Sequence, residues 1–151
     1  MDRILMVCVG NICRSPIAEA LWNARLGDEF SSRCSGSAGL MARLGDPVHP
    51  FSVELLERNG VNLPEGGATP WSQIDPKAWD LILTMESRHR EEIEQRSPVL
   101  RGRVFTLGHW SGFEVPDPMG RPMSAFEEAY ELIDRGVGDW FKRLGYDKVA
   151  A

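Results

Sequence analysis

The side chains most capable of chemistry are gathered in one short stretch near the N-terminus, VCVGNICRSP. Cys8 is a potential nucleophile, and Arg14, six positions later, carries a planar guanidinium that can hold two oxygens of a phosphate at once. Between them, Gly10 permits a backbone conformation with positive φ, and Asn11 tolerates one. A loop that curls in this way directs its N–H groups inward, as in an anion-binding nest. The stretch therefore predicts an anion site suited to phosphate.

Cys8 opens this loop, where a nucleophile would meet a bound phosphate. Inward N–H groups, a following helix N-terminus and Arg14 would all favour a thiolate, and the Ser15 hydroxyl can donate a hydrogen bond to the sulfur. Cys8 taken alone would be read as a buried strand residue. In combination with Gly-Asn and Arg-Ser-Pro, it points to phosphoryl transfer through a cysteinyl-phosphate intermediate.

Phosphoryl transfer to sulfur also needs a group that protonates the leaving oxygen and later activates water. The candidate is Asp117 in the segment EVPDPMG, late in the chain. Pro116 and Pro118 restrict the backbone around it, and Gly120 loosens the far side. The alternative is that the Asp-Pro pair only marks a turn, and this segment alone does not decide between the two.

The elements that must position these groups follow from the apolar pattern. Ile4–Val9 is an apolar run without polar alternation, which predicts a strand covered on both faces. Pro16–Leu26 has helical spacing, with Ser15 as the expected N-cap and proline at the first helical position. The loop therefore joins the carboxyl end of a strand to the start of a helix.

Further strands and helices alternate along the rest of the chain. We expect strands at 37–40, 81–85 and 104–107, and helices at 50–59, 87–95 and 125–144. Ser124 and Glu127 match a capping box at the start of the last helix. Gly136 and Gly138 each cost about 1 kcal/mol relative to alanine, so we expect that helix to bend or fray near its end.

This alternation predicts one α/β domain over residues 1–151, with a four-stranded parallel sheet and helices on both faces, as in flavodoxin-like folds. In such sheets, ligands bind outside the carboxyl ends of the strands. The Cys8 loop and Asp117 both follow strands at that edge, so we expect them to meet there.

Composition limits the classes of function. The 151 residues are 42% hydrophobic and 26% charged, as in ordinary soluble proteins, and the net charge of −5 argues against nucleic acid as a partner. No apolar stretch approaches the ~20 residues of a membrane helix, so we expect no membrane insertion. The segment MDRILMVCVG lacks the features of a signal peptide. We therefore expect a cytoplasmic protein.

The three cysteines do not predict a disulfide framework, because their number is odd and no export signal precedes them. Cys8 and Cys13 lack a second Cys/His pair at ligand spacing, and the histidines are scattered, so a metal site is not expected. The remaining cysteine is Cys34, and the histidines are His49, His89 and His109.

Cys8-Val-Gly-Asn-Ile-Cys-Arg14-Ser-Pro, together with Val-Pro-Asp117-Pro, resembles the low-molecular-weight protein tyrosine phosphatases. The resemblance covers nearly the whole chain, since Ser37-Ala-Gly39, Asp80–Met85 and Phe126–Tyr130 also fit. The stretches LILTMESRH and RGRVFTLGHW look most like bacterial members that serve exopolysaccharide and capsule export. Those members typically dephosphorylate a membrane-associated tyrosine autokinase, so the implied partner is a phosphotyrosine protein of that kind.

The resemblance assigns the catalytic roles. It makes Cys8 the nucleophile, Arg14 the phosphate and transition-state ligand, and Asp117 the acid and then the base. It requires neither metal nor other cofactor. The implied phosphate-binding loop consists of Val9, Gly10, Asn11, Ile12, Cys13, Arg14 and Ser15.

The resemblance also implies supporting roles. Ser15 would stabilise the thiolate, and Asn11 would hold the strained loop conformation, braced by Ser37. Cys13 would form a reversible disulfide with an oxidised Cys8 and so protect it. We expect the protein to be a monomer or a weak dimer.

Three residues are expected to form the wall of the substrate pocket: Ile12, Leu40 and Met119. Many relatives carry tyrosine where this chain has Met119, and methionine offers a softer contact to an aromatic ring. Trp71 is a further candidate, although plain packing is the favoured interpretation for it.

Three alternatives remain. A protein arginine phosphatase on the same scaffold tends to carry threonine at the position of Ile12, whereas isoleucine suits a phenyl ring. A thiol-dependent arsenate reductase needs further cysteines downstream, and none follows Cys34. A silent phosphate-binding module should have lost Cys8, Arg14 or Asp117.

Overall fold

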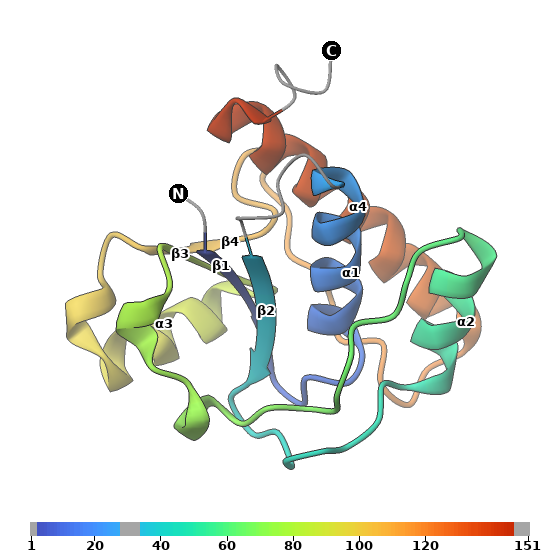
Figure 1. Ribbon diagram of the computed structural model, residues 1–151, viewed down its shortest axis with the longest axis horizontal. Coiled ribbons are helices and arrows are strands. Elements are labelled where there is room, and N and C mark those ends of the chain that lie inside the picture. The colour runs from blue at the N-terminus through green and yellow to red at the C-terminus, as the bar shows by residue number, and fades with distance from the viewer. Residues whose placement is uncertain (1–2, 28–33, 147–151) are drawn as a thin grey trace.

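The computed structural model describes residues 3–27 and 34–146 as one α/β domain. Its four strands pair in parallel in the order β2-β1-β3-β4. The strands are β1 (Arg3–Cys8), β2 (Cys34–Gly39), β3 (Leu81–Thr84) and β4 (Val104–Thr106). The helices are α1 (Arg14–Leu26), α2 (Pro50–Arg58), α3 (Ser87–Arg96) and α4 (Met123–Leu144). Figure 1 shows α1 and α4 on one side of the sheet and α3 on the other, which confirms the expected fold class.

The continuous apolar run of β1 is explained by its central place in the sheet. Ile4, Met6 and Cys8 pack into the core shared with α1 and α4. Leu5 and Val7 face the opposite core, which includes side chains of β3, β4 and α3. Because helices cover both faces, no position along β1 after its first residue is exposed to solvent.

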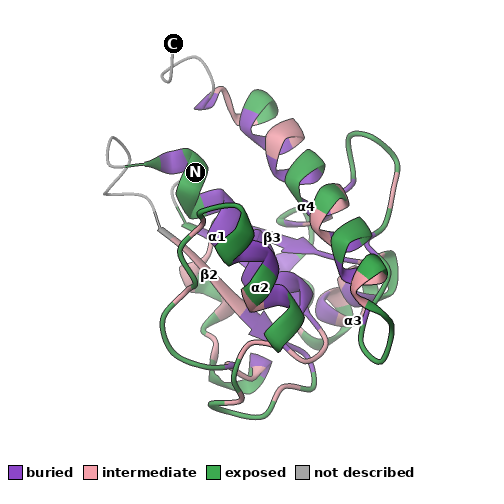
Figure 2. Ribbon diagram, turned by 90° about the vertical axis from the view of Figure 1, so that its right-hand side faces the viewer, coloured by how far each residue is buried: buried purple, intermediate pink, exposed green. Residues whose placement is uncertain are grey.

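Two expectations about α4 are wrong. The helix begins at Met123 after Pro122 without a side-chain cap, so the capping box at Ser124 is not formed. It also continues through both glycines to Leu144 rather than fraying. A Cβ on Gly136 would lie 2.7 Å from the Leu107 side chain, so glycine here allows the helix to approach the end of β4 closely. Figure 2 shows buried and exposed positions alternating along α4, as its amphipathic sequence predicts.

None of the helices within the described ranges combines the length and the apolar composition needed to cross a bilayer.

Candidate active site

The loop after β1 turns directly into α1, and the helix start differs from the expected one. Helix α1 begins at Arg14 with Cys13 as the N-cap, so Ser15 and Pro16 lie inside the first turn. The Ser15 side chain is therefore not a cap and is free to serve the loop. Gly10 does not adopt a positive φ; Asn11 does, with φ of 57°. Asparagine is one of the few residues that tolerates this conformation without a large strain.

A chain of hydrogen bonds fixes the proton on Ser15. The backbone N–H of Thr69 donates to Asn11 Oδ1 at 2.8 Å, which orients the Asn11 amide. Asn11 Nδ2 therefore donates to Ser15 Oγ at 2.7 Å. Since that oxygen is already an acceptor, its own proton is left for Cys8 Sγ, 2.9 Å away. The backbone N–H of Asn11 also donates to the sulfur, at 3.3 Å. The Cys8 sulfur therefore has two hydrogen-bond donors, one from a side chain and one from the backbone.

The backbone of the segment after β2 hydrogen-bonds to the Cys8 loop. Leu40 N donates to Cys8 O at 3.0 Å, and Met41 N donates to Val9 O at 2.9 Å. A Cβ on Gly39 would lie 2.5 Å from Val9 O and 2.9 Å from Asn11 N. Only glycine leaves room for the loop at this position.

Arg14 is almost fully buried, and one nitrogen of its guanidinium makes both of its protein hydrogen bonds. Nη1 donates to Glu86 Oε2 at 2.7 Å and to Val115 O at 2.8 Å. Within the described part of the chain, Nη2 and Nε have no hydrogen-bond partner. They form the side of the fork that can hold two phosphate oxygens.

Asp117 both makes a turn and contributes to the cavity. Its Oδ1 accepts a hydrogen bond from Met119 N at 3.0 Å, which closes a local Asx turn. Val115 N donates to Met85 O at 2.9 Å, which fixes the start of the same loop to the end of β3. The second carboxylate oxygen of Asp117 remains available to carry a proton. The two interpretations of the Asp-Pro pair are therefore compatible.

These groups meet in one cavity of about 180 Å³. It is lined by Cys8, Val9, Gly10, Ile12, Cys13, Arg14, Asp117 and Met119. The structure thus brings together the expected nucleophile, arginine and acid with two of the three expected wall residues. Leu40 lies in an adjoining cavity of about 250 Å³ that shares Val9 and Asp117 with the first. Trp71 packs in the core around Leu5 and Val7, as favoured from the sequence.

Cys13 lines the same cavity as Cys8. Burial, together with the negative charges of Cys8 and Asp117, raises the pKa of its thiol to about 12 against the opposing effect of Arg14. Cys13 is therefore a protonated thiol near neutral pH. It does not compete with Cys8 as a nucleophile.

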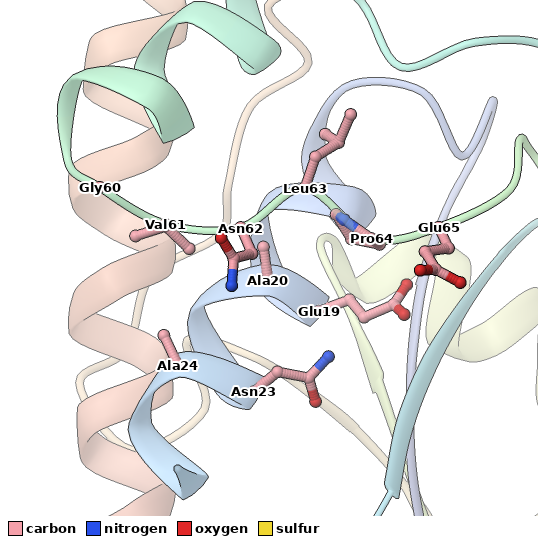
Figure 3. A pocket seen from close by; sticks show the side chains of 10 residues that line it. All are labelled: Glu19, Ala20, Asn23, Ala24, Gly60, Val61, Asn62, Leu63, Pro64 and Glu65. Carbon is pink, nitrogen blue, oxygen red and sulfur yellow. The ribbon is translucent and has the colours of Figure 1, made fainter. Parts of the chain in front are cut away.

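The expected brace between Ser37 and Asn11 is not formed. Ser37 Oγ donates to Glu19 Oε1 at 2.6 Å instead, because Ser37 in β2 faces α1 rather than the loop. Thr69 supplies the brace to Asn11. Glu19 borders a separate cavity of about 360 Å³ between α1 and residues 60–65 (Figure 3), and burial raises the pKa of its carboxyl. That cavity contains no cysteine and lies apart from the Cys8 loop.

Three functional contacts were missed from the sequence: Thr69, Glu86 and the carbonyl of Val115. Glu86 could have been predicted from the sequence, because it follows β3 at the same edge of the sheet as the Cys8 loop. Thr69 and Val115 act through backbone atoms, which no side-chain pattern reveals.

Comparison with known proteins agrees with this geometry. The family model described as low molecular weight phosphotyrosine protein phosphatase matches residues 3–150. EpsP of Ralstonia nicotianae, a probable low molecular weight protein-tyrosine-phosphatase, is 40% identical over 141 residues, which cover 93% of this chain and 94% of that protein.

Two solved structures superpose over most of the chain. Wzb of Vibrio vulnificus in complex with benzylphosphonate has a TM-score of 0.86 at 33% identity and covers 94% of this chain and 98% of its own. The arginine phosphatase YwlE, solved with a phosphorylated active-site serine, has a TM-score of 0.85 at 26% identity and covers 99% of both chains. With its cysteine, arginine and aspartate in one cavity and a family match along nearly its whole length, the chain belongs to the low molecular weight phosphotyrosine protein phosphatases.

Proposed function

We propose that the protein hydrolyses phosphotyrosine in proteins by way of a phosphate ester on Cys8. The observation that carries the proposal is the cavity that Cys8, Arg14 and Asp117 line together with the apolar side chains of Ile12 and Met119. A nucleophile, a phosphate ligand and a proton donor are the three groups that this reaction needs.

The reaction proceeds in two transfers. Cys8 Sγ attacks phosphorus while the bond to the tyrosine oxygen breaks, and Asp117 gives its proton to that leaving oxygen. Water then attacks the phosphocysteine and gives a proton to Asp117, which releases orthophosphate and the Cys8 thiolate. Arg14 and the loop N–H groups stabilise the charge on the three transferring oxygens in both steps.

The wall of the cavity favours phosphotyrosine over phosphoarginine. Ile12 and Met119 offer apolar contact to a phenyl ring, whereas a guanidinium needs polar partners once it is removed from water. The similarity to YwlE keeps phosphoarginine as the second candidate, but no polar side chain stands at position 12 to receive it.

We further propose that the substrate is a tyrosine autokinase of exopolysaccharide or capsule export, and that the enzyme meets it in the cytoplasm as a monomer or weak dimer. The similarity to EpsP and Wzb supports this. The cavity has a volume of only about 180 Å³, so the surrounding surface would have to select the protein partner.

The covalent intermediate provides the direct test. Wild-type protein mixed with excess p-nitrophenyl phosphate and quenched in acid should carry one phosphate, which peptide mass spectrometry locates on Cys8. Phosphate on a histidine or aspartate, or burst-free turnover with no labelled peptide, would refute the proposed route.

We also propose that Cys13 protects the nucleophile from irreversible oxidation. Peroxide converts the Cys8 thiolate to a sulfenic acid. The Cys13 sulfur then attacks the Cys8 sulfur as its own proton passes to the departing hydroxyl, which releases water and forms a disulfide that thiols reduce. Cys13→Ala should therefore recover far less of its own starting activity than wild type when dithiothreitol follows peroxide. Equal recovery in both proteins would contradict the protective role.

A further inference from the structure

Among the described residues, Glu86 is the one side chain that hydrogen-bonds to Arg14. It is the N-cap residue of α3 and lies two residues after the end of β3. Its Oε2 accepts from Arg14 Nη1 at 2.7 Å, and the side chains are 19% and 2% exposed, respectively. A buried ion pair of this kind depends on good geometry, because both charges have lost most of their water.

The two acceptors on Nη1 determine the direction of the whole guanidinium. Glu86 Oε2 and Val115 O occupy the two protons of that nitrogen, at 2.7 and 2.8 Å. Because the guanidinium is planar and rigid, fixing one nitrogen at two points fixes its plane. Nη2 and Nε are then presented together to the cavity, as bidentate binding of an oxyanion requires.

Glu86 is able to maintain this contact in its ionised form. Burial opposes its ionisation, but hydrogen bonds from Arg14 and Arg88 outweigh that effect and hold its pKa below the ordinary value. Arg88 makes its shorter contact with the other oxygen, Oε1, at 3.2 Å. His89 Nε2 lies 3.5 Å from Oε2, and burial and the Arg14 charge lower the pKa of this histidine. Neither ring nitrogen of His89 has a hydrogen-bond partner among the described residues, so His89 leaves Glu86 Oε2 to Arg14.

We propose that Glu86 is a positioning residue that sets the orientation of the Arg14 fork and thereby the affinity of the site for the transferring phosphoryl group. This inference rests on the proposed function. Glu86 itself touches Arg14 and not the substrate. Its negative charge should by itself weaken anion binding, so an orienting role and a purely electrostatic role predict opposite effects when the carboxylate is removed.

The test compares variants at Glu86 with a matched control on the same helix. Glu94 is 20% exposed and pairs with Arg90 at 3.3 Å, so Glu94→Ala removes a similarly placed carboxylate from an arginine outside the site. The measurements are kcat/KM on p-nitrophenyl phosphate, tungstate binding by calorimetry, and melting temperature. Tungstate is a tetrahedral oxyanion, so its affinity measures how well Nη2 and Nε of Arg14 are placed to bind phosphate, without any turnover.

Glu86→Ala should lower kcat/KM about 100-fold, the loss expected when a catalytic group is displaced by about 1 Å. It should weaken tungstate binding at least about tenfold, while Glu94→Ala stays close to wild type in both. A folded Glu86→Ala protein that binds tungstate as tightly as wild type, or more tightly, would overturn the proposal. If wild type released no phosphate, the proposed function would fail, whereas tungstate binding would still decide the orienting role.

Two conservative variants keep the test decisive if Glu86→Ala does not fold. Glu86→Gln keeps the reach of the side chain and an acceptor oxygen but removes the charge. Glu86→Asp keeps the charge but shortens the reach. An orienting role predicts weaker tungstate binding and lower kcat/KM in Glu86→Asp than in wild type although the charge is unchanged, and wild-type values in that variant would overturn it.

Discussion

Cys8→Ser is expected to abolish the hydrolysis of aryl phosphates, with a loss of roughly 10⁴-fold or more in kcat, as for other enzymes that lose their covalent nucleophile. Cys8 Sγ lies in the cavity with Arg14 and Asp117 and has two hydrogen bonds, from the Ser15 hydroxyl and the Asn11 N–H. A serine oxygen would keep its proton at neutral pH and remain a poor nucleophile. Steady-state release of p-nitrophenol measures the loss.

The control for this prediction lies at the other end of the sheet. Cys34 pairs with Arg3 in the β1–β2 register, whereas Cys8 pairs with Gly39, so the two cysteines belong to opposite ends of these strands. Cys34→Ser should retain wild-type activity. The Cys8→Ser protein should still bind tungstate, because Arg14 and the loop amides remain. Turnover by Cys8→Ser at more than about a tenth of the wild-type rate would rule out Cys8 as the nucleophile.

Asp117→Asn is expected to slow phenyl phosphate hydrolysis by about 10²- to 10³-fold, within the usual contribution of general acid catalysis. An asparagine can keep the turn, because its side-chain oxygen can still accept from Met119 N, 3.0 Å from Asp117 Oδ1 in the structure. It cannot transfer a proton. The loss should be smaller with p-nitrophenyl phosphate, whose leaving group departs readily without protonation.

Comparing the losses on phenyl phosphate and p-nitrophenyl phosphate distinguishes a role of Asp117 in acid catalysis from a role in shaping the loop. Asp139→Asn makes the same chemical change at a half-buried residue of α4 whose carboxylate accepts from Ser111 Oγ at 2.6 Å and which does not line the cavity. It should leave both substrates unaffected. Equal losses on both substrates for Asp117→Asn would indicate that Asp117 only shapes the loop.

The sequence was sufficient wherever neighbouring residues determine the structure. The unbroken apolar run of β1 predicted a central strand, and the six-residue spacing from Cys8 to Arg14 located the phosphate loop. Asp117 could be found because it follows a strand at the same edge of the sheet. These inferences use only local pattern and the geometry of parallel sheets.

The sequence was insufficient where distant backbone and side-chain groups share one hydrogen-bond network. Thr69 is 58 positions from Asn11, and Glu86 and Val115 are 72 and 101 positions from Arg14. No local rule connects such pairs. Ser15 was misassigned for a similar reason. A serine before a proline fits the N-cap pattern, but in the folded chain its hydroxyl hydrogen-bonds to the sulfur of Cys8.

Phosphate release from two peptides of the same sequence, one with phosphotyrosine and one with phosphoarginine at the central position, tests the central claim most directly. The apolar wall formed by Ile12 and Met119 over the Cys8 loop predicts rapid release from the phosphotyrosine peptide and little from the other. Preferential release from the phosphoarginine peptide would contradict the assignment of phosphotyrosine as the substrate, although the chemistry assigned to Cys8 would stand.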